Sequence, residues 1–150
     1  MNKNLNEPIN FFIFKTCEQI YALYLSNVSE VIRYKNIFNL PGSPSYVKGV
    51  VVERGIVIPL ISLKDFLKLN TNNEKLLLNK DLVVCTHKDI HMAIMVDKIY
   101  GLRSIDIESC IDHENTNEYF ITGFKTNLDN ETKRVGLLDL DQLIPAMSKM

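Results

Sequence analysis

Two apolar runs meet at a tight corner in the stretch Val47-Lys48-Gly49-Val50-Val51-Val52-Glu53-Arg54-Gly55-Ile56-Val57-Ile58-Pro59-Leu60-Ile61-Ser62-Leu63. β-Branched side chains favour a pleated, half-buried backbone, and glycine permits the positive φ of a tight turn. The stretch therefore predicts a β-hairpin with Arg54 at its tip, in which Gly49, Gly55 and Pro59 are structural turn residues.

An arginine at a rigid hairpin tip has two interpretations. Its planar guanidinium can pair with a carboxylate or a backbone carbonyl of a partner, which makes Arg54 a candidate recognition residue. The alternative is an ordinary solvated turn residue, because connecting segments generally lie at the surface. The hairpin alone does not separate these interpretations.

The composition is that of a globular protein without a nucleic-acid footprint. The chain has 150 residues, 46% of them hydrophobic and 23% charged, which allows one compact unit or two small subdomains with a common core. The net charge is −1 and the basic residues are scattered. A nucleic-acid partner is therefore not expected, since phosphate binding requires a basic patch.

The cysteines and the N-terminus point to a cytoplasmic protein. Cys17, Cys85 and Cys110 are far apart and form no CxxC pair, which argues against a disulfide framework and a zinc ribbon. The first ten residues are polar, unlike a secretory signal, and no apolar run approaches the ~20 residues that span a bilayer. We therefore expect no direct membrane insertion.

The remaining pattern is one of short strands separated by turns, which favours a sandwich or barrel over βαβ units. Besides the Arg54 hairpin, strands are predicted at 10–16, 20–25, 81–86, 90–97, 102–107, 119–125 and 133–138. Residues 27–34 fit a single helical turn that leads into a strand, although periodicity does not decide this. Ser62 is expected to cap a short helix at 63–69. A second short helix, at 139–147, is expected to be kinked or stopped near Pro145.

We expect a polar N-terminal segment at 1–9, followed by a single domain at 10–147. The most polar stretch, 70–80, is the predicted seam between two β-barrel subdomains. Each half consists of predicted strands followed by a short helix, which supports this division.

No motif for catalysis, cofactor binding or metal binding stands out. The chain has no GxxxxGK[ST] or GxGxxG phosphate loop and no GxSxG elbow. His87 and His91 would share a face only on a helix, but Lys88-Asp89 is a predicted turn that places them on different strands. Asp112-His113-Glu114 is interpreted as a solvated loop. We therefore assign no catalytic residue, cofactor-binding residue or metal ligand, although carboxylate pairs distant in sequence stay possible.

The better candidates are residues of a protein-binding surface. Val28 and Glu30 stand near the end of the first predicted sheet, and Ile99 and Leu102 just after the strand that ends at Asp97. Exposed together, the apolar members would form a groove rimmed by Glu30 and Arg54, in which apolar contacts give affinity and charges fix register. The alternative for Val28, Ile99 and Leu102 is core packing.

Several motifs in a fixed order carry a family resemblance. They are Phe12-Ile13-Phe14 with Tyr21-Ala22-Leu23, Val28-Ser29-Glu30-Val31-Ile32, Leu40-Pro41-Gly42-Ser43-Pro44-Ser45-Tyr46-Val47-Lys48-Gly49-Val50, Arg54-Gly55-Ile56-Val57-Ile58-Pro59-Leu60-Ile61-Ser62-Leu63, Ala93-Ile94-Met95-Val96-Asp97-Lys98-Ile99 and Tyr119-Phe120-Ile121-Thr122-Gly123. With these motifs the chain resembles, from about Asn10 to Ile144, the CheW family, the adaptor domain of bacterial chemotaxis signalling.

The resemblance implies a mainly β protein with two small SH3-like five-stranded β-barrels, which share an apolar interface and carry short helices. It implies a non-enzymatic cytoplasmic adaptor without cofactors, recruited to membrane receptor arrays. The implied partners are the cytoplasmic tip of a chemoreceptor and the regulatory domain of the histidine kinase CheA. The implied receptor groove consists of Val28, Glu30, Arg54, Ile99 and Leu102.

The chain also departs from the family pattern. Val52 and Glu53 replace the usual Asn-Leu before the Arg-Gly corner, Ser62 replaces an aspartate, and Ala93 replaces a common glycine. These departures leave the receptor and the kinase undetermined. The alternatives are a related adaptor of a surface-motility or pilus-type pathway and, from a different class, a small β-barrel enzyme or ligand-binding module.

Overall fold

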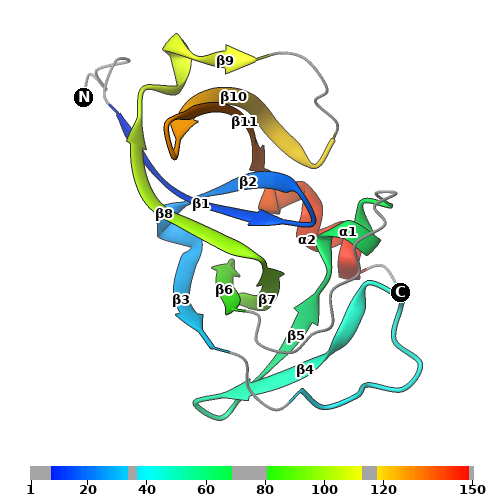
Figure 1. Ribbon diagram of the computed structural model, residues 1–150. Helices are drawn as coiled ribbons and strands as arrows, with labels where there is room; N and C mark the ends of the chain where they lie inside the picture. The colour runs from blue at the N-terminus through cyan, green and yellow to red at the C-terminus, as the bar shows by residue number, and fades with distance from the viewer. Residues whose placement is uncertain (1–7, 34–36, 69–80, 113–117, 149–150) are drawn as a thin grey trace. The chain divides into compact units, whose positions relative to one another are not determined.

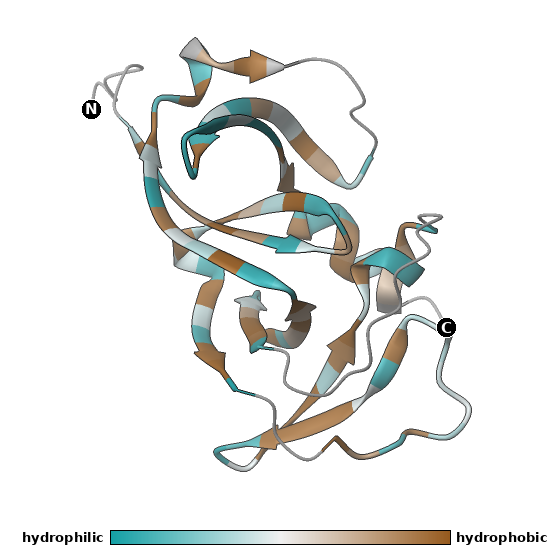
Figure 2. Ribbon diagram, viewed as in Figure 1, coloured by the Kyte–Doolittle hydropathy of each residue, from teal (hydrophilic) through white to brown (hydrophobic). Residues whose placement is uncertain are grey.

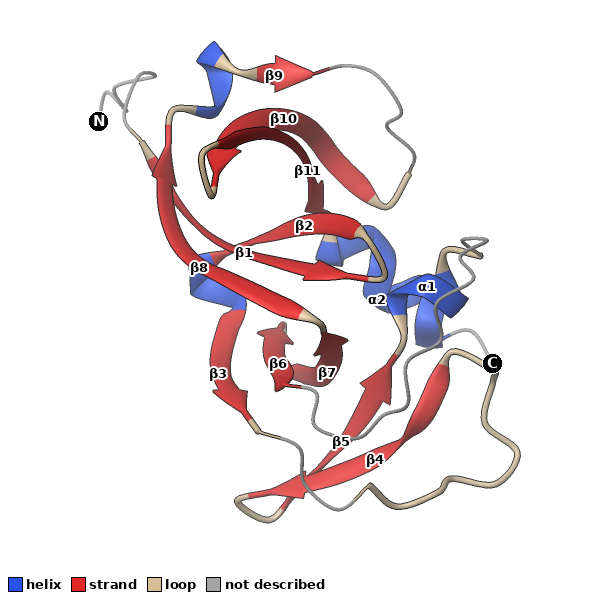
Figure 3. Ribbon diagram, in the orientation of Figure 1, coloured by secondary structure: helices blue, strands red, loops and turns tan. Residues whose placement is uncertain are grey.

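The computed structural model describes residues 8–33, 37–68, 81–112 and 118–148 (Figure 1). They form two compact units that interleave along the chain. The first unit comprises Met1–Lys15, Gln19–Ser26 and Ile99–Met150, and the second comprises Thr16–Glu18 and Asn27–Lys98. Strands make up most of the described chain (Figure 3), so the predicted mainly β fold is confirmed.

The predicted seam at 70–80 falls outside the described residues. The described segments on either side of it, 37–68 and 81–98, belong to the same unit, and both ends of the chain belong to the other. The apolar interface expected between two barrels stays a prediction.

The first unit is built on a six-stranded sheet with the strand order β8-β1-β2-β11-β10-β9. Its strands are β1 (Ile9–Thr16), β2 (Gln19–Tyr24), β8 (Lys98–Ile105), β9 (Ile111–Asp112), β10 (Phe120–Leu128) and β11 (Glu131–Leu138). β11 pairs with β10 in antiparallel fashion and with β2 in parallel.

The core of this unit follows from strand alternation, because residues two apart point to the same face. Phe11 and Ile13 of β1 are fully buried against Phe124 of β10. The rings of Phe11 and Phe124 lie 5.5 Å apart in a tilted arrangement, which favours the electrostatics of aromatic pairs. The buried cluster comprises Phe11, Ile13, Ala22, Ile105, Phe124, Leu128, Val135 and Leu137.

The second unit is built on a five-stranded sheet with the strand order β3-β6-β7-β5-β4. Its strands are β3 (Val28–Ile32), β4 (Val47–Glu53), β5 (Ile56–Ile61), β6 (Asp81–His87) and β7 (Ile90–Val96). β4 and β5 form the hairpin predicted from the apolar runs, with Arg54 and Gly55 at its tip. The buried cluster comprises Ile32, Val51, Ile58, Leu60, Leu82, Val84 and Ala93.

The two units share one connection pattern. In the first, the β1–β2 hairpin lies beside β11, with Leu137 paired in parallel with Ala22. In the second, the β6–β7 hairpin lies beside β5, with Leu60 paired in parallel with Ala93. A short helix follows β11 and β5 alike. Each unit therefore has a short helix after the strand that pairs in parallel with its hairpin, whereas the division of the chain into halves at 70–80 stays a prediction.

Four hairpin tips share one backbone conformation. The tip pairs Cys17-Glu18, Arg54-Gly55, Lys88-Asp89 and Asp129-Asn130 all have positive φ at both residues. Such turns match the right-handed twist of the strands they connect. Seven of these eight residues are not glycine, so these turns carried a weaker sequence signal than an Asn-Gly pair would give.

The short helices match the predictions in part. A 3-10 turn, η1 (Leu25–Asn27), precedes β3, so the predicted helical turn leading into a strand is confirmed, although it begins two residues before the predicted range. Ser62 caps α1 (Leu63–Phe66), where its Oγ accepts the Asp65 N–H at 3.3 Å. Of the two effects predicted for Pro145, the stop is wrong, because α2 (Leu140–Ser148) continues past that residue, whereas the kink stays a prediction. A proline in the sixth position removes only one backbone donor from so short a helix.

The stretch 98–112 differs most from its prediction. β8 begins at Lys98 rather than at 102, with Gly101 at a φ of +85° inside it. A second 3-10 turn, η2 (Ile107–Ser109), follows. Asp112, predicted in a loop, belongs to β9 and pairs with Gly123. His113 and Glu114 lie outside the described residues.

Among the residues that the structure describes, no helix has the length and apolar character needed to cross a membrane.

Candidate protein-binding site

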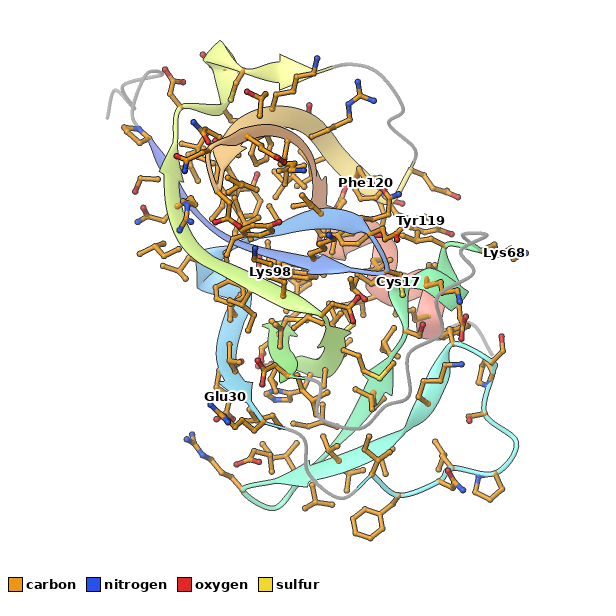
Figure 4. The ribbon with its side chains drawn as sticks, viewed as in Figure 1. Cys17, Glu30, Lys68, Lys98, Tyr119 and Phe120 are labelled. Carbon is orange, nitrogen blue, oxygen red and sulfur yellow. The ribbon has the colours of Figure 1, made fainter. Side chains whose placement is uncertain are left out.

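The two edge strands of the second unit approach each other at the tip of the β4–β5 hairpin. β3 and β4 are the first and last strands of the sheet, yet Glu30 on β3, labelled in Figure 4, forms an ion pair with Arg54, at 3.6 Å between Oε2 and Nη2. A sheet whose edges meet in this way is curled, as expected for a small barrel. The structure thus brings together the two charged residues predicted to rim a binding groove.

The guanidinium of Arg54 is accessible although its backbone is fixed. Its side chain is 78% exposed, whereas that of Glu30 is 26% exposed. Arg54 and Gly55 both have positive φ, as in the tight turns that match the twist of hairpin strands. An exposed ion pair contributes only about 0–1 kcal/mol to stability. A partner's carboxylate can therefore replace Glu30 at little cost.

Val28 lies at an irregular point of β3. It pairs with Cys85 of β6, whereas Glu30 pairs with Val84, so two residues of β3 advance against one residue of β6. Ser29 is the extra residue of this β-bulge. Val28 is half-buried. Bulges re-aim side chains and occur often beside functional sites.

Ile99 and Leu102 lie in β8 of the first unit, whereas Val28, Glu30 and Arg54 lie in the second. Ile99 is half-buried and Leu102 is 53% exposed. The exposure of Leu102 argues against core packing for this residue. A single groove formed by all five residues stays a prediction.

Of the three residues predicted to be turn residues, one lies in a turn and two lie inside strands. Gly55 lies in the turn, with a φ of +76°. Gly49 and Pro59 lie inside β4 and β5, where Pro59 pairs with Val50 and Gly49 follows a register shift. Gly49 tolerates its φ of +145° because it has no Cβ.

The outward face of the hairpin is an apolar surface that the sequence interpretation missed. Val52 and Val57 are paired across β4 and β5 and are 45% and 62% exposed. Phe38, 56% exposed, pairs with Val50 through two backbone hydrogen bonds of 2.8 and 2.9 Å. Figure 2 shows the apolar character of both strands. An apolar surface next to an accessible arginine is typical of protein-binding sites.

The histidines lie as predicted, on different strands. His87 is in β6 and His91 is in β7, and each has a polar neighbour: Asn27 Nδ2 lies 3.4 Å from His87 Nδ1, and Thr86 Oγ1 lies 2.9 Å from His91 Nδ1. No group of three or more potential metal ligands occurs in the described part of the chain.

Comparisons with known proteins define the relatives of this chain. Residues 10–147 match the family model of the CheW-like domain. The chemotaxis protein CheW of Thermotoga maritima is 28% identical over 131 residues, which cover 87% of this chain and 84% of that protein. Protein PilI of Pseudomonas aeruginosa is 26% identical over 96 residues, which cover 64% of this chain and 53% of PilI.

A solved structure supports the fold. The crystal structure of the scaffolding protein TtCheW from Thermoanaerobacter tengcongensis aligns with a TM-score of 0.73. The alignment covers 89% of this chain and 90% of that one at 23% identity. At this identity the likeness concerns the fold alone.

Proposed function

This chain belongs to the CheW-like domain family, and we propose that it acts as a chemotaxis adaptor that couples the cytoplasmic tip of a chemoreceptor to the histidine kinase CheA. The observation that carries this proposal is the match of residues 10–147 to one adaptor domain. The proposed role is scaffolding in the cytoplasm at receptor arrays, without catalysis.

The proposed receptor surface includes Val28, Glu30 and Arg54 of the second unit, with Ile99 and Leu102 of the first. A receptor helix would place apolar side chains against the apolar members and a carboxylate against Arg54, which is recognition of a helix in a groove. Two features of the second unit support this: the accessible guanidinium and the exposed apolar face of its hairpin.

An adaptor of this kind transmits a signal only through differential binding. If its contacts with receptor and kinase differ between the active and inactive kinase states, receptor conformation shifts the kinase equilibrium. No chemical step by the adaptor is needed.

The test uses the Arg54→Glu variant in binding assays with a soluble receptor tip and with the CheA regulatory domain. We expect wild type to bind both partners. Arg54→Glu should weaken receptor binding about tenfold or more, because it replaces an attraction with a repulsion, and should leave kinase binding nearly unchanged. Arg134→Glu, the same charge change at an exposed position of β11 in the first unit, is the matched control and should bind as wild type does.

A charge exchange separates partner contact from internal pairing. Arg54→Glu also disrupts the ion pair with Glu30, but the double variant Glu30→Arg/Arg54→Glu restores an ion pair of reversed polarity. We expect the double variant to bind the receptor tip as weakly as Arg54→Glu does. Restored binding would mean that Arg54 acts through Glu30 alone. Absence of binding to both partners, together with turnover of a small molecule, would refute the adaptor role.

A second candidate keeps the adaptor role in a different pathway, such as surface motility or pilus control. The observation that favours it is the similarity to PilI, a relative not named as a chemotaxis protein. Parallel assays with receptor tips and kinase domains of both kinds of pathway distinguish the candidates.

A further inference from the structure

The bulge in β3 determines how two of the proposed receptor-binding residues are directed. Glu30, Val31 and Ile32 pair regularly with Val84, Val83 and Leu82, but Val28 pairs with Cys85 because Ser29 is inserted. In a regular strand, residues two apart point to the same face. The insertion breaks this alternation between Val28 and Glu30.

One residue of β6 holds both neighbours of Val28. The Asn27 side-chain amide donates to the Thr86 carbonyl oxygen at 3.2 Å, and the Ser29 and Thr86 hydroxyl oxygens lie 2.5 Å apart. Thr86 Oγ1 also lies 2.9 Å from Nδ1 of His91 on β7. The three side chains Ser29, Thr86 and His91 therefore form a continuous hydrogen-bonded chain.

This chain of bonds compensates for a weak point of the sheet. β3 is an edge strand whose sheet neighbour is β6, and a bulge locally disrupts the backbone ladder. The hydrogen bonds from the Asn27 and Ser29 side chains to Thr86 hold β3 against β6 just before and just after Val28.

We propose that Thr86 is a positioning residue for receptor recognition: it holds the β3 bulge, and with it the backbone on either side of Val28, in the conformation that the partner binds. This rests on the proposed adaptor function. A surface ordered before binding loses less conformational entropy when the partner docks, so the benefit appears as affinity.

The test measures the affinity of Thr86→Val for a soluble receptor tip. Valine keeps the shape and the β-branching but removes the hydroxyl. The change removes the hydroxyl's bonds with both Ser29 and His91. Loss of the bond that reaches the bulge, the one with Ser29, should weaken receptor binding about three- to tenfold. Binding to the CheA regulatory domain should stay within about twofold of wild type, a split that general destabilisation would not produce. Thr86→Ser should retain receptor affinity, since it restores the hydroxyl.

Two further variants complete the design. Thr132→Val makes the same change at an exposed position of β11 in the first unit and should bind as wild type does. Ser29→Ala combined with Thr86→Val should bind no more weakly than Thr86→Val alone, because both remove the same bond.

Three results would overturn the inference: wild-type receptor affinity in Thr86→Val, equal losses for receptor and kinase, or additive losses in the double variant. Failure of wild type to bind the receptor tip would instead refute the proposed function itself.

Discussion

Gly49→Ala should destabilise the second unit by about 2–6 kcal/mol. Gly49 is buried with a φ of +145°, and a Cβ there would lie 2.5 Å from Ile37 Cγ2 and 2.6 Å from the Phe38 carbonyl oxygen. That oxygen accepts the Val50 N–H at 2.8 Å, so it cannot retreat without loss of the bond. Backbone strain of about 1–3 kcal/mol and overpacking of about 1–3 kcal/mol both contribute.

Urea and thermal unfolding followed by circular dichroism measure this effect. For a chain of this size, each kcal/mol corresponds to about 2–4 °C in Tm, so we expect a decrease of about 4–24 °C. Gly42→Ala is the matched control, because Gly42 has a φ of +80° but no heavy atom within 4 Å of its Cβ position. Equal losses in both variants would show that backbone strain, rather than the close approach to Phe38, explains the glycine.

The fold was predictable where local patterns determine it. The run of β-branched residues around Arg54 predicted the β4–β5 hairpin, and the hydroxyl of Ser62 predicted the start of α1. β9 was not predictable in this way. It is two residues long and exists because Ile111 and Asp112 pair with β10, which lies farther along the chain. Pairing of this kind leaves no periodicity in the sequence.

The site was predictable in its residue types but not in its geometry. Motif spacing led to Glu30 and Arg54, and the structure places them within 3.6 Å. The role of Thr86 had no sequence signal, because its partner Ser29 is 57 residues away and acquires its position from a bulge. The outward apolar face of Val52 and Val57 was missed because a strand apolar on both faces resembles a buried strand.

We expect Cys85 to react with iodoacetamide at pH 8 at least about a thousandfold more slowly in the folded protein than in the chain unfolded in guanidinium. Burial raises the pKa of this thiol from 9.0 to about 12. The thiolate is the reactive form, and its fraction at pH 8 falls from about 10% to about 0.01%. Mass spectrometry of peptides gives each rate. Cys17 and Cys110, both only half-buried, should react first.

The same raised pKa predicts how stability depends on pH. The unfolded chain loses the Cys85 proton first, so the free energy of unfolding is unaffected by this group below about pH 9 and decreases as the pH rises from 9 toward 12. By pH 10.5 the loss amounts to about 2 kcal/mol. Cys85→Val removes the titrating group and should lose correspondingly less stability over this range.

The labelling rate of Cys85 also tests the β3 bulge, because Cys85 pairs with Val28 there. If Cys85 were labelled as fast as Cys17, the bulge would open readily. This result would contradict a binding surface that is ordered before the partner docks.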